Sequence, residues 1–142
     1  DIVWAINPAN DALDKIILRM KEFGNELCEQ SGIQYNFDEQ GDLLNVTLPL
    51  RQRSDLYLIF KEALNNAVKH SEAKTIYILM KKEAGNLHLT IADDGKGFNT
   101  SHSSRGNGLK NMSSRAVEIN AILKTHSVAG NGTNITLDIP IT

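Results

Sequence analysis

The sequence contains a single cysteine, Cys28, among its 142 residues. A lone cysteine excludes an internal disulfide framework and has no partner for a Cys-x-x-Cys metal site. Cys28 falls on the apolar face of an expected helix, so we interpret it as a core residue. The sequence also lacks any run of about 18 apolar residues, the length that a membrane-spanning helix needs. A formal net charge of −2 gives no basic field that would favour contacts with nucleic acid.

The composition that remains is that of a soluble globular chain, with 41% hydrophobic and 23% charged residues. The length favours one domain with a core of its own. The chain opens on Asp1 rather than Met, and residues 1–10 are very apolar for a terminus. We therefore interpret residues 1–10 as the tail of an upstream element, and residues 11–142 as the domain itself.

Hydrophobic periodicity predicts the order of the elements. A first helix is expected after Pro8, capped by Asn10 or Asp11 and stopped by Gly32. A long helix is expected over residues 50–70, after Pro49, and a third over residues 109–119. Strands are expected over residues 33–37, 46–48, 74–82, 87–91, 122–128 and 133–139. Paired strands interleaved with helices predict a mixed sheet that helices cover on one face.

The long helix carries the first candidate site, between Glu62 and His70. Its polar face presents Glu62, Asn66 and Lys69 at spacings i, i+4 and i+7, so the three side chains stack over two turns. A carboxylate, an amide and a cation in a row could hold a metal-bound phosphate. Taken alone, the same pattern is more typical of the solvated face of an amphipathic helix.

Three glycine-containing stretches follow. The first is Asp93-Asp94-Gly95-Lys96-Gly97, at the end of a strand, where two glycines permit a tight turn. The second, residues 106–109, precedes a helix and would offer free N–H groups to phosphate. The third is the turn at residues 130–133. Between the first two lies a polar stretch, residues 100–105, expected to be a mobile loop. Each stretch alone is an ordinary turn or helix start, and neither a P-loop nor a GxGxxG motif is present.

In this order and spacing, the four stretches together resemble the catalytic, ATP-binding domain of sensor histidine kinases, in the superfamily shared with gyrase, the ninety-kilodalton heat-shock chaperone and MutL-type repair ATPases. Residues 62–70 resemble the N box, 93–97 the G1 box, 106–109 the G2 box and 132–133 the closing GT motif. Residues 60–71 are most similar to the nitrate-sensor-like subgroup. The Trp-Ala-Ile-Asn-Pro stretch with Asn10-Asp11 resembles the junction after the dimerisation helices in Bacteroidetes-type two-component kinases.

The resemblance implies an α+β fold of the Bergerat type. This is a two-layer α/β sandwich, with a mixed, mostly antiparallel sheet of about five strands covered on one face by about three helices. It also implies roles for the helical motif. Asn66 would hold the Mg²⁺ that bridges the phosphates, Lys69 and His70 would contact phosphate, and Glu62 is the catalytic candidate. One amide is a plausible ligand, since Mg²⁺ keeps several waters and takes few protein oxygens.

For the base, the resemblance implies that Asp93 accepts a hydrogen bond from the adenine amino group and that Thr133 supports the base. A charged hydrogen bond of this kind is worth roughly 1.5–3 kcal/mol, and guanine would present an acceptor instead. The remaining implied nucleotide contacts are the glycines of the turns and the residue that follows them: Gly95, Gly97, Gly106, Gly108 and Leu109. Residues 98–107 would form the ATP lid.

Three departures from the family pattern are visible. Asp94 stands where asparagine is frequent, and Asn120-Ala121 stands where glycine is common. The phosphoacceptor histidine motif is absent, because none of the four histidines lies in such a context. His88 and His126 fall in strand patterns and are interpreted as structural, and His102 in the loop as solvated.

The implied function is to bind Mg-ATP and donate the γ-phosphoryl group to a histidine on upstream dimerisation helices, for relay to an aspartate of a response regulator. The fragment alone is then expected to bind ATP without phosphorylating anything, and the full-length protein to be a cytoplasmic homodimer or the cytoplasmic part of a membrane-anchored sensor. The alternative is an ATP hydrolase of the same superfamily, with Glu62 activating water. A nucleotide-gated interaction module without catalysis is a third hypothesis, which the intact set of polar residues and glycines disfavours.

Overall fold

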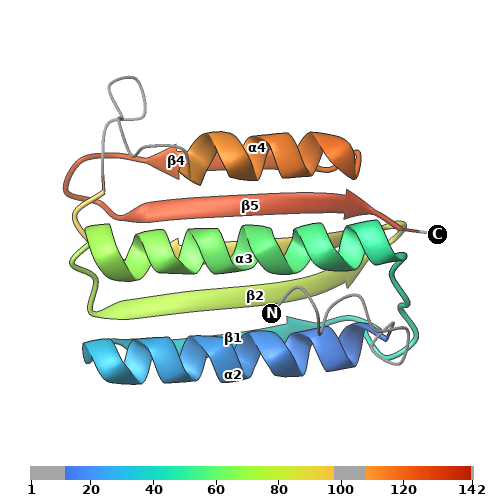
Figure 1. Ribbon diagram of the computed structural model, residues 1–142. Helices are drawn as coiled ribbons and strands as arrows, with labels where there is room; N and C mark the ends of the chain where they lie inside the picture. The colour runs from blue at the N-terminus through green and yellow to red at the C-terminus, as the bar shows by residue number, and fades with distance from the viewer. Residues whose placement is uncertain (1–11, 98–107, 142) are drawn as a thin grey trace.

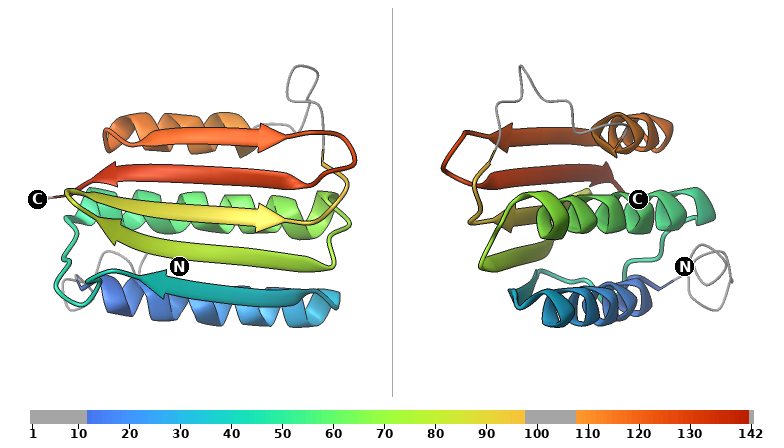
Figure 2. Two further views of the ribbon diagram at one scale, coloured as in Figure 1. Left: turned by 180° about the vertical axis from the view of Figure 1, so that it is seen from behind. Right: turned by 60° about the vertical axis from the view of Figure 1, so that its left-hand side comes forward.

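The computed structural model describes residues 12–97 and 108–141, and these form two layers. Figures 1 and 2 show three helices side by side on one face of a five-stranded sheet. The helices are α2 (Leu13–Ser31), α3 (Leu50–His70) and α4 (Gly108–Glu118). The strands are β1 (Gln34–Gln40), β2 (Thr75–Glu83), β3 (Asn86–Asp93), β4 (Ile122–Ser127) and β5 (Thr133–Pro140). The α+β sandwich that the sequence predicts is confirmed.

The sheet has the order β1-β2-β3-β5-β4. β1 pairs with β2 in parallel, and the other three pairings are antiparallel. Antiparallel neighbours can be joined by short turns, as β2–β3 and β4–β5 are, whereas the parallel pair needs a long crossover. Here α3 supplies that crossover, and it lies centrally between α2 and α4 over the sheet (Figure 1).

The core lies between the two layers because the strands alternate and the helices are amphipathic. Ile76, Ile78 and Met80 of β2 point toward the helices and are buried. On α3, Leu56, Ile59, Phe60, Ala63, Leu64 and Ala67 form the matching buried stripe. Full burial of one such large apolar side chain stabilises the fold by about 1.5–3 kcal/mol. The face of the sheet away from the helices carries none of the described helices (Figure 2).

The two ends of α2 differ in how well the sequence predicts them. Its C-terminal end is confirmed, since Gly32 adopts the left-handed conformation and the Ile33 N–H donates to the Cys28 carbonyl at 2.9 Å. Cys28 is buried, as predicted. Its N-terminal cap position is Ala12, with no side-chain cap, so capping by Asn10 or Asp11 is a wrong prediction.

The segment between β1 and α3 also departs from expectation. β1 runs to Gln40, because its parallel register with β2 continues to Lys81. The strand predicted over residues 46–48 is not formed, and Thr47 makes only an isolated antiparallel bridge with Ala12. Leu43, Val46 and Leu48 are nevertheless buried in the core. Their apolar pattern therefore reflects burial of a loop that belongs to none of the described strands.

Candidate functional site

A pocket opens at one end of the molecule, between α3, the end of β3, the start of β5 and the N-terminus of α4. We call it the end pocket. Its lining residues come from all four elements: Ala63, Asn66, Ala67, Ile91, Asp93, Leu109, Thr133 and Ile135. Four residues that the sequence singles out are thus brought together: Asn66, Asp93, Leu109 and Thr133. Apolar walls with a few polar groups are the usual character of a small-molecule site.

A row of polar residues crosses three neighbouring strands at one side of the end pocket, and two of them, Asp93 and Thr133, line it. Asp93 of β3 pairs with Thr133 of β5, and Thr133 pairs with Ser127 of β4. Because paired residues on adjacent strands point to the same face, the three side chains lie side by side beneath the helices. Thr133 and Ser127 are both buried, with 8% of each residue exposed. Ser127 donates to the Gly132 carbonyl at 3.2 Å and is 2.8 Å from the Thr133 hydroxyl.

The turn after Asp93 is built from main-chain contacts. The Asp93 carboxylate accepts a hydrogen bond from the Gly95 N–H at 2.9 Å. The Lys96 N–H donates to the Ser71 carbonyl at 2.7 Å, which ties the turn to the end of α3. A Cβ at Gly95 would collide with that carbonyl, and Gly97 has a φ of +63°. Only glycine fits both conditions well, so the structure gives these two glycines a role in shaping the turn.

Asp94 secures the other side of this turn. Its Oδ1 accepts hydrogen bonds from the N–H groups of Lys74 and Thr75, at 2.8 and 3.0 Å. These backbone bonds hold the pKa of the Asp94 carboxyl below its ordinary value. They fasten the end of β3 to the start of β2, so Asp93 is presented from a fixed backbone. An asparagine could accept the same two bonds through its amide oxygen.

The opposite side of the end pocket is formed by α3 and the first residue of α4. A Cβ added to Gly108 would lie 3.1 Å from Asn66 Nδ2 and 3.3 Å from Glu62 Cδ. Gly108 therefore lets the N-terminus of α4 approach both side chains closely. Within the described ranges, the Asn66 Nδ2 atom is buried and has no hydrogen-bond partner. An orphaned polar atom beside a helix N-terminus suits an anionic or metal-bound group, because the first N–H groups of a helix carry positive partial charge.

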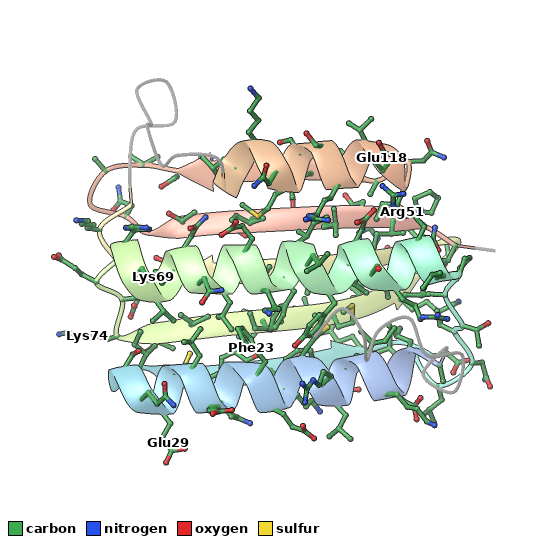
Figure 3. The ribbon with its side chains drawn as sticks, in the orientation of Figure 1. Phe23, Glu29, Arg51, Lys69, Lys74 and Glu118 are labelled. Atoms are coloured by element: carbon green, nitrogen blue, oxygen red, sulfur yellow. The ribbon has the colours of Figure 1, made fainter. Side chains whose placement is uncertain are left out.

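The structure does not gather every predicted residue into the end pocket. Lys69 and His70 are exposed on the last turn of α3, and Figure 3 shows Lys69 at the pocket end of that helix. Glu62 lines a neighbouring groove between α3 and α4, which we call the α3–α4 groove, together with Lys61, Asn65 and Arg115 among others. Gly106 and the predicted lid over residues 98–107 lie outside the described residues, whereas Gly97 and Gly108, which flank the lid, are described.

Sequence reasoning missed several residues that build the site. Ser127 and Ser71 act through contacts with residues distant in sequence or with backbone, which no local motif reveals. Ile91 and Ile135 line the pocket as continuations of the apolar alternation of β3 and β5. Their inward orientation is visible in the sequence, but their position at the mouth of a pocket is not.

Comparison with known proteins places the fold and pocket in a family. Residues 51–142 match the family described as histidine kinase-, DNA gyrase B- and HSP90-like ATPases. The chain belongs to this family, and it is an ATP-binding domain of the sensor histidine kinase type. The N box, G1 box and GT motif identified from the sequence lie in the matched region.

Among curated relatives, sensor histidine kinase YdfH of Bacillus subtilis is 35% identical over 127 residues, covering 87% of this chain and 30% of the relative. Sensor histidine kinase LiaS of the same organism is 30% identical over 123 residues, covering 86% of this chain and 34% of the relative. The chain thus spans about a third of the length of these relatives. The finer subgroup assignments, nitrate-sensor-like and Bacteroidetes-type, stay predictions.

Solved structures agree on the fold. The histidine kinase domain of the Erythrobacter litoralis EL346 blue-light activated kinase superposes with a TM-score of 0.75 at 21% identity, over 89% of this chain and 61% of that chain. The catalytic domain of histidine kinase ThkA gives a TM-score of 0.73 at 15% identity, over 91% of this chain and 92% of that chain. Full-length ShkA, solved in complex with AMPPNP, gives 0.74 at 18% identity, over 88% of this chain and 29% of that chain. Of the helices described, none is long and apolar enough to cross a membrane.

Proposed function

We propose that this chain binds Mg-ATP in the end pocket and, within a longer protein, donates the γ-phosphoryl group to a histidine of an upstream dimerisation domain. The observation that carries the proposal is the pairing of two unlike polar groups across one apolar pocket. On one side is the Asp93 carboxylate, and on the other the buried, unpartnered Asn66 amide beside the N-terminus of α4. A nucleotide has matching ends, a base with an amine and a chain of phosphates.

Asp93 would recognise the base. Its carboxylate lines the end pocket and is held by the Gly95 N–H, while Ile91 and Ile135 offer apolar surface to a purine ring. An ionised carboxylate accepts hydrogen bonds and cannot donate them. The exocyclic amine of adenine satisfies it, whereas the carbonyl that guanine carries at the same position would face it with a second acceptor.

Asn66 and the start of α4 would receive the phosphates. The first turn of α4 offers N–H groups to anionic oxygens, and Gly108 keeps that approach open. The amide oxygen of Asn66 could be a ligand of a Mg²⁺ ion that keeps most of its waters. The Nδ2 atom of the same amide, which has no hydrogen-bond partner among the described residues, could donate to a phosphate oxygen or a metal-bound water. When bound, Mg²⁺ would supply charge neutralisation between the phosphates. Lys69 and His70 stand exposed near this end, and Gly106 belongs to the same proposed set.

Phosphoryl transfer would then follow from positioning. An imidazole nitrogen of the acceptor histidine attacks the γ-phosphorus, the bond to the β–γ bridging oxygen breaks, and ADP leaves. The catalytic domain holds the reactant in line and stabilises its charge. We extend the proposal to a homodimeric full-length protein at the cytoplasmic side, with residues 1–10 as the end of the linker from the dimerisation helices, residues 11–142 as the ATP-binding domain, and a response regulator as the receiver.

Calorimetry with the 142-residue chain tests nucleotide binding. ATP with Mg²⁺ should bind, GTP should bind far more weakly, and Asp93→Ala should abolish ATP binding. An Asp38→Ala variant, at an exposed carboxylate on β1, should leave the affinity unchanged. Equal affinities for ATP and GTP would contradict the assignment of Asp93 to the base.

A second candidate, ATP hydrolysis, is favoured by the position of Glu62. Its Oε2 atom would lie 3.4 Å from a Cβ at Gly108, so the carboxylate is close to the proposed phosphate end. It could activate water in a hydrolase or polarise the acceptor histidine in a kinase. Mixing the chain with its dimerisation helices and γ-labelled ATP separates the two. Acid-labile label on the helices supports the kinase, and steady phosphate release without label, lost in Glu62→Gln, supports the hydrolase.

A further inference from the structure

The Ser127 hydroxyl is a buried group that the proposed mechanism does not use. It belongs to the last residue of β4 and does not line the end pocket. It lies directly behind Thr133, which does line the pocket, at a distance of 2.8 Å between the two hydroxyl oxygens. The Ser127 hydroxyl also lies 3.2 Å from the Gly132 carbonyl oxygen. Ser127, Thr133 and Asp93 form one row across adjacent strands, so a change in the orientation of the Thr133 hydroxyl occurs next to the Asp93 carboxylate.

Counting hydrogens fixes the direction of these two bonds. A carbonyl oxygen can only accept, so the bond to Gly132 uses the single hydrogen of the Ser127 hydroxyl. The bond between the two hydroxyls must then use the hydrogen of Thr133. No other arrangement makes both bonds at once. The Thr133 oxygen consequently has no hydrogen to offer to the pocket and presents only lone pairs there.

We infer that Ser127 is a specificity-determining residue that holds Thr133 as an acceptor, so that the base end of the pocket combines two acceptors, Thr133 and Asp93. This inference rests on the proposed nucleotide site and sharpens it. A base with an exocyclic amine can donate hydrogen bonds to these two acceptors. A base with a carbonyl at that position meets no donor from either side chain, and an unpaired buried carbonyl is costly. The ring nitrogen beside the adenine amine can be reached by a water that donates one hydrogen to it and the other to Thr133.

The inference predicts what removal of the Ser127 hydroxyl does. In Ser127→Ala the Thr133 hydroxyl is released and can rotate to donate into the pocket. ATP, which the wild-type wall already satisfies, should keep nearly its original affinity. ITP, which carries a carbonyl in place of the amine, should gain affinity. The preference for ATP over ITP should therefore fall by about threefold to tenfold, the range of one hydrogen bond between neutral groups.

Calorimetry of ATP and ITP with the full 142-residue chain tests this expectation. In a Thr133→Val background, Ser127→Ala should leave the ATP-to-ITP ratio unchanged within about twofold, because the hydroxyl through which it acts is gone. Lys124→Ala, on the exposed side of the same strand, should not change the ratio in the wild-type background. Thermal unfolding without nucleotide reports whether each variant is folded. If Ser127→Ala is not, Ser127→Cys, whose thiol is a weak donor, should lower the ratio in the same direction.

Two results would overturn the inference, and they are distinguishable. If Ser127→Ala weakens ATP and ITP by the same factor while the wild-type preference persists, Ser127 only supports the local structure, and the proposed nucleotide site stands. If the wild-type chain binds neither nucleotide, or Asp93→Ala binds ATP as well as wild type, the proposed function fails and this inference fails with it.

Discussion

At the scale of single residues, the end pocket depends on polar atoms whose partners are fixed by the backbone. Asp93 and Asp94 are adjacent in sequence but do different work. One carboxylate faces the pocket, and the other fastens two strands by accepting the N–H groups of Lys74 and Thr75. Asn66 contrasts with both, because its Nδ2 atom is buried without a hydrogen-bond partner among the residues described. Such a group costs stability unless a ligand satisfies it, which makes it a sensitive position for substitution.

Asn66→Ala should remove the Mg²⁺ dependence of ATP binding, because it deletes the proposed oxygen ligand. Calorimetry with ATP in Mg²⁺ and in EDTA measures this dependence. Asn65→Ala is the matched control, since Asn65 is the preceding residue on α3 and lines the α3–α4 groove instead of the end pocket. The same magnesium requirement in Asn66→Ala and wild type would reject the role given to this side chain.

Asp94 should make the fold sensitive to acid. Its pKa is lowered in the folded state by hydrogen bonds from Thr75 and Lys74. The stabilisation it gives is therefore complete above the carboxyl's ordinary pKa, and it is lost as the pH falls toward the folded-state value. In Asp94→Asn, which keeps the acceptor oxygen but cannot ionise, this part of the acid dependence should disappear. Urea unfolding between about pH 6 and pH 3 measures it. An unaltered acid dependence in Asp94→Asn would contradict the role of the charge.

At the scale of elements, α3 and α4 are held together by charges at the end away from the pocket. The Asp55 carboxylate of α3, with 2% of the residue exposed, contacts Arg51 Nε at 2.9 Å and Arg115 of α4 at 3.4 Å. Arg51 also reaches Glu118 at 3.3 Å, and Figure 3 shows these two residues together at that end. The position of α4 sets where its N-terminus meets Asn66, so this cluster bears on the pocket from a distance.

Asp55→Ala should lower the free energy of unfolding by about 2 kcal/mol, the scale of hydrogen bonds to a charged group. The two arginines are partly exposed and can return to water, which keeps the loss below that of a fully buried pair. Glu118→Gln is the control, and its effect should stay within about 0.5 kcal/mol because its ion pair is on the surface. Urea denaturation compares the two variants, and equal effects would show that Asp55 is no more important than a surface charge.

At the scale of the whole molecule, the end pocket is shared by both layers, because α3, α4, β3 and β5 all contribute to it. A ligand there links the sheet to two of the three described helices. ATP at about 100 times its dissociation constant should stabilise the chain by about 2.7 kcal/mol. For a chain of this size the unfolding midpoint should then rise by about 6–10 °C. Differential scanning fluorimetry measures the rise, and Asp93→Ala should not show it. A wild-type midpoint insensitive to ATP would count against the site.

The fold could be predicted largely because its signals are local. Pro49 and the apolar stripe place α3 at Leu50–His70, and alternating residues place the two hairpins to within a residue or two. The errors fall where tertiary contacts decide. Residues 46–48 have the composition of a strand, but within the described residues Thr47 makes only an isolated bridge with Ala12, which takes the cap position of α2.

The candidate site divides in the same way. Asn66, Asp93 and Thr133 could be identified because they belong to motifs with fixed spacing. Ser127 could not, since its contact with Thr133 depends on the register of β4 against β5. The anchoring of β2 by Asp94 was hidden for the same reason, because its partners lie about 20 residues away in sequence. The roles proposed for Lys69 and His70 remain predictions of the resemblance.

The main-chain construction of the turn at residues 93–97 makes the rim of the pocket available for chemical labelling. Lys96 is held through its N–H to Ser71 and its carbonyl to the Gly130 N–H, while its side chain is exposed. Cys28 is buried, and burial raises the pKa of its thiol to about 11, so it stays protonated and protected near neutral pH. A Lys96→Cys variant can therefore carry a fluorophore at that single position, with the natural cysteine left in place. The dye would report nucleotide arrival optically, from a position whose side chain is exposed.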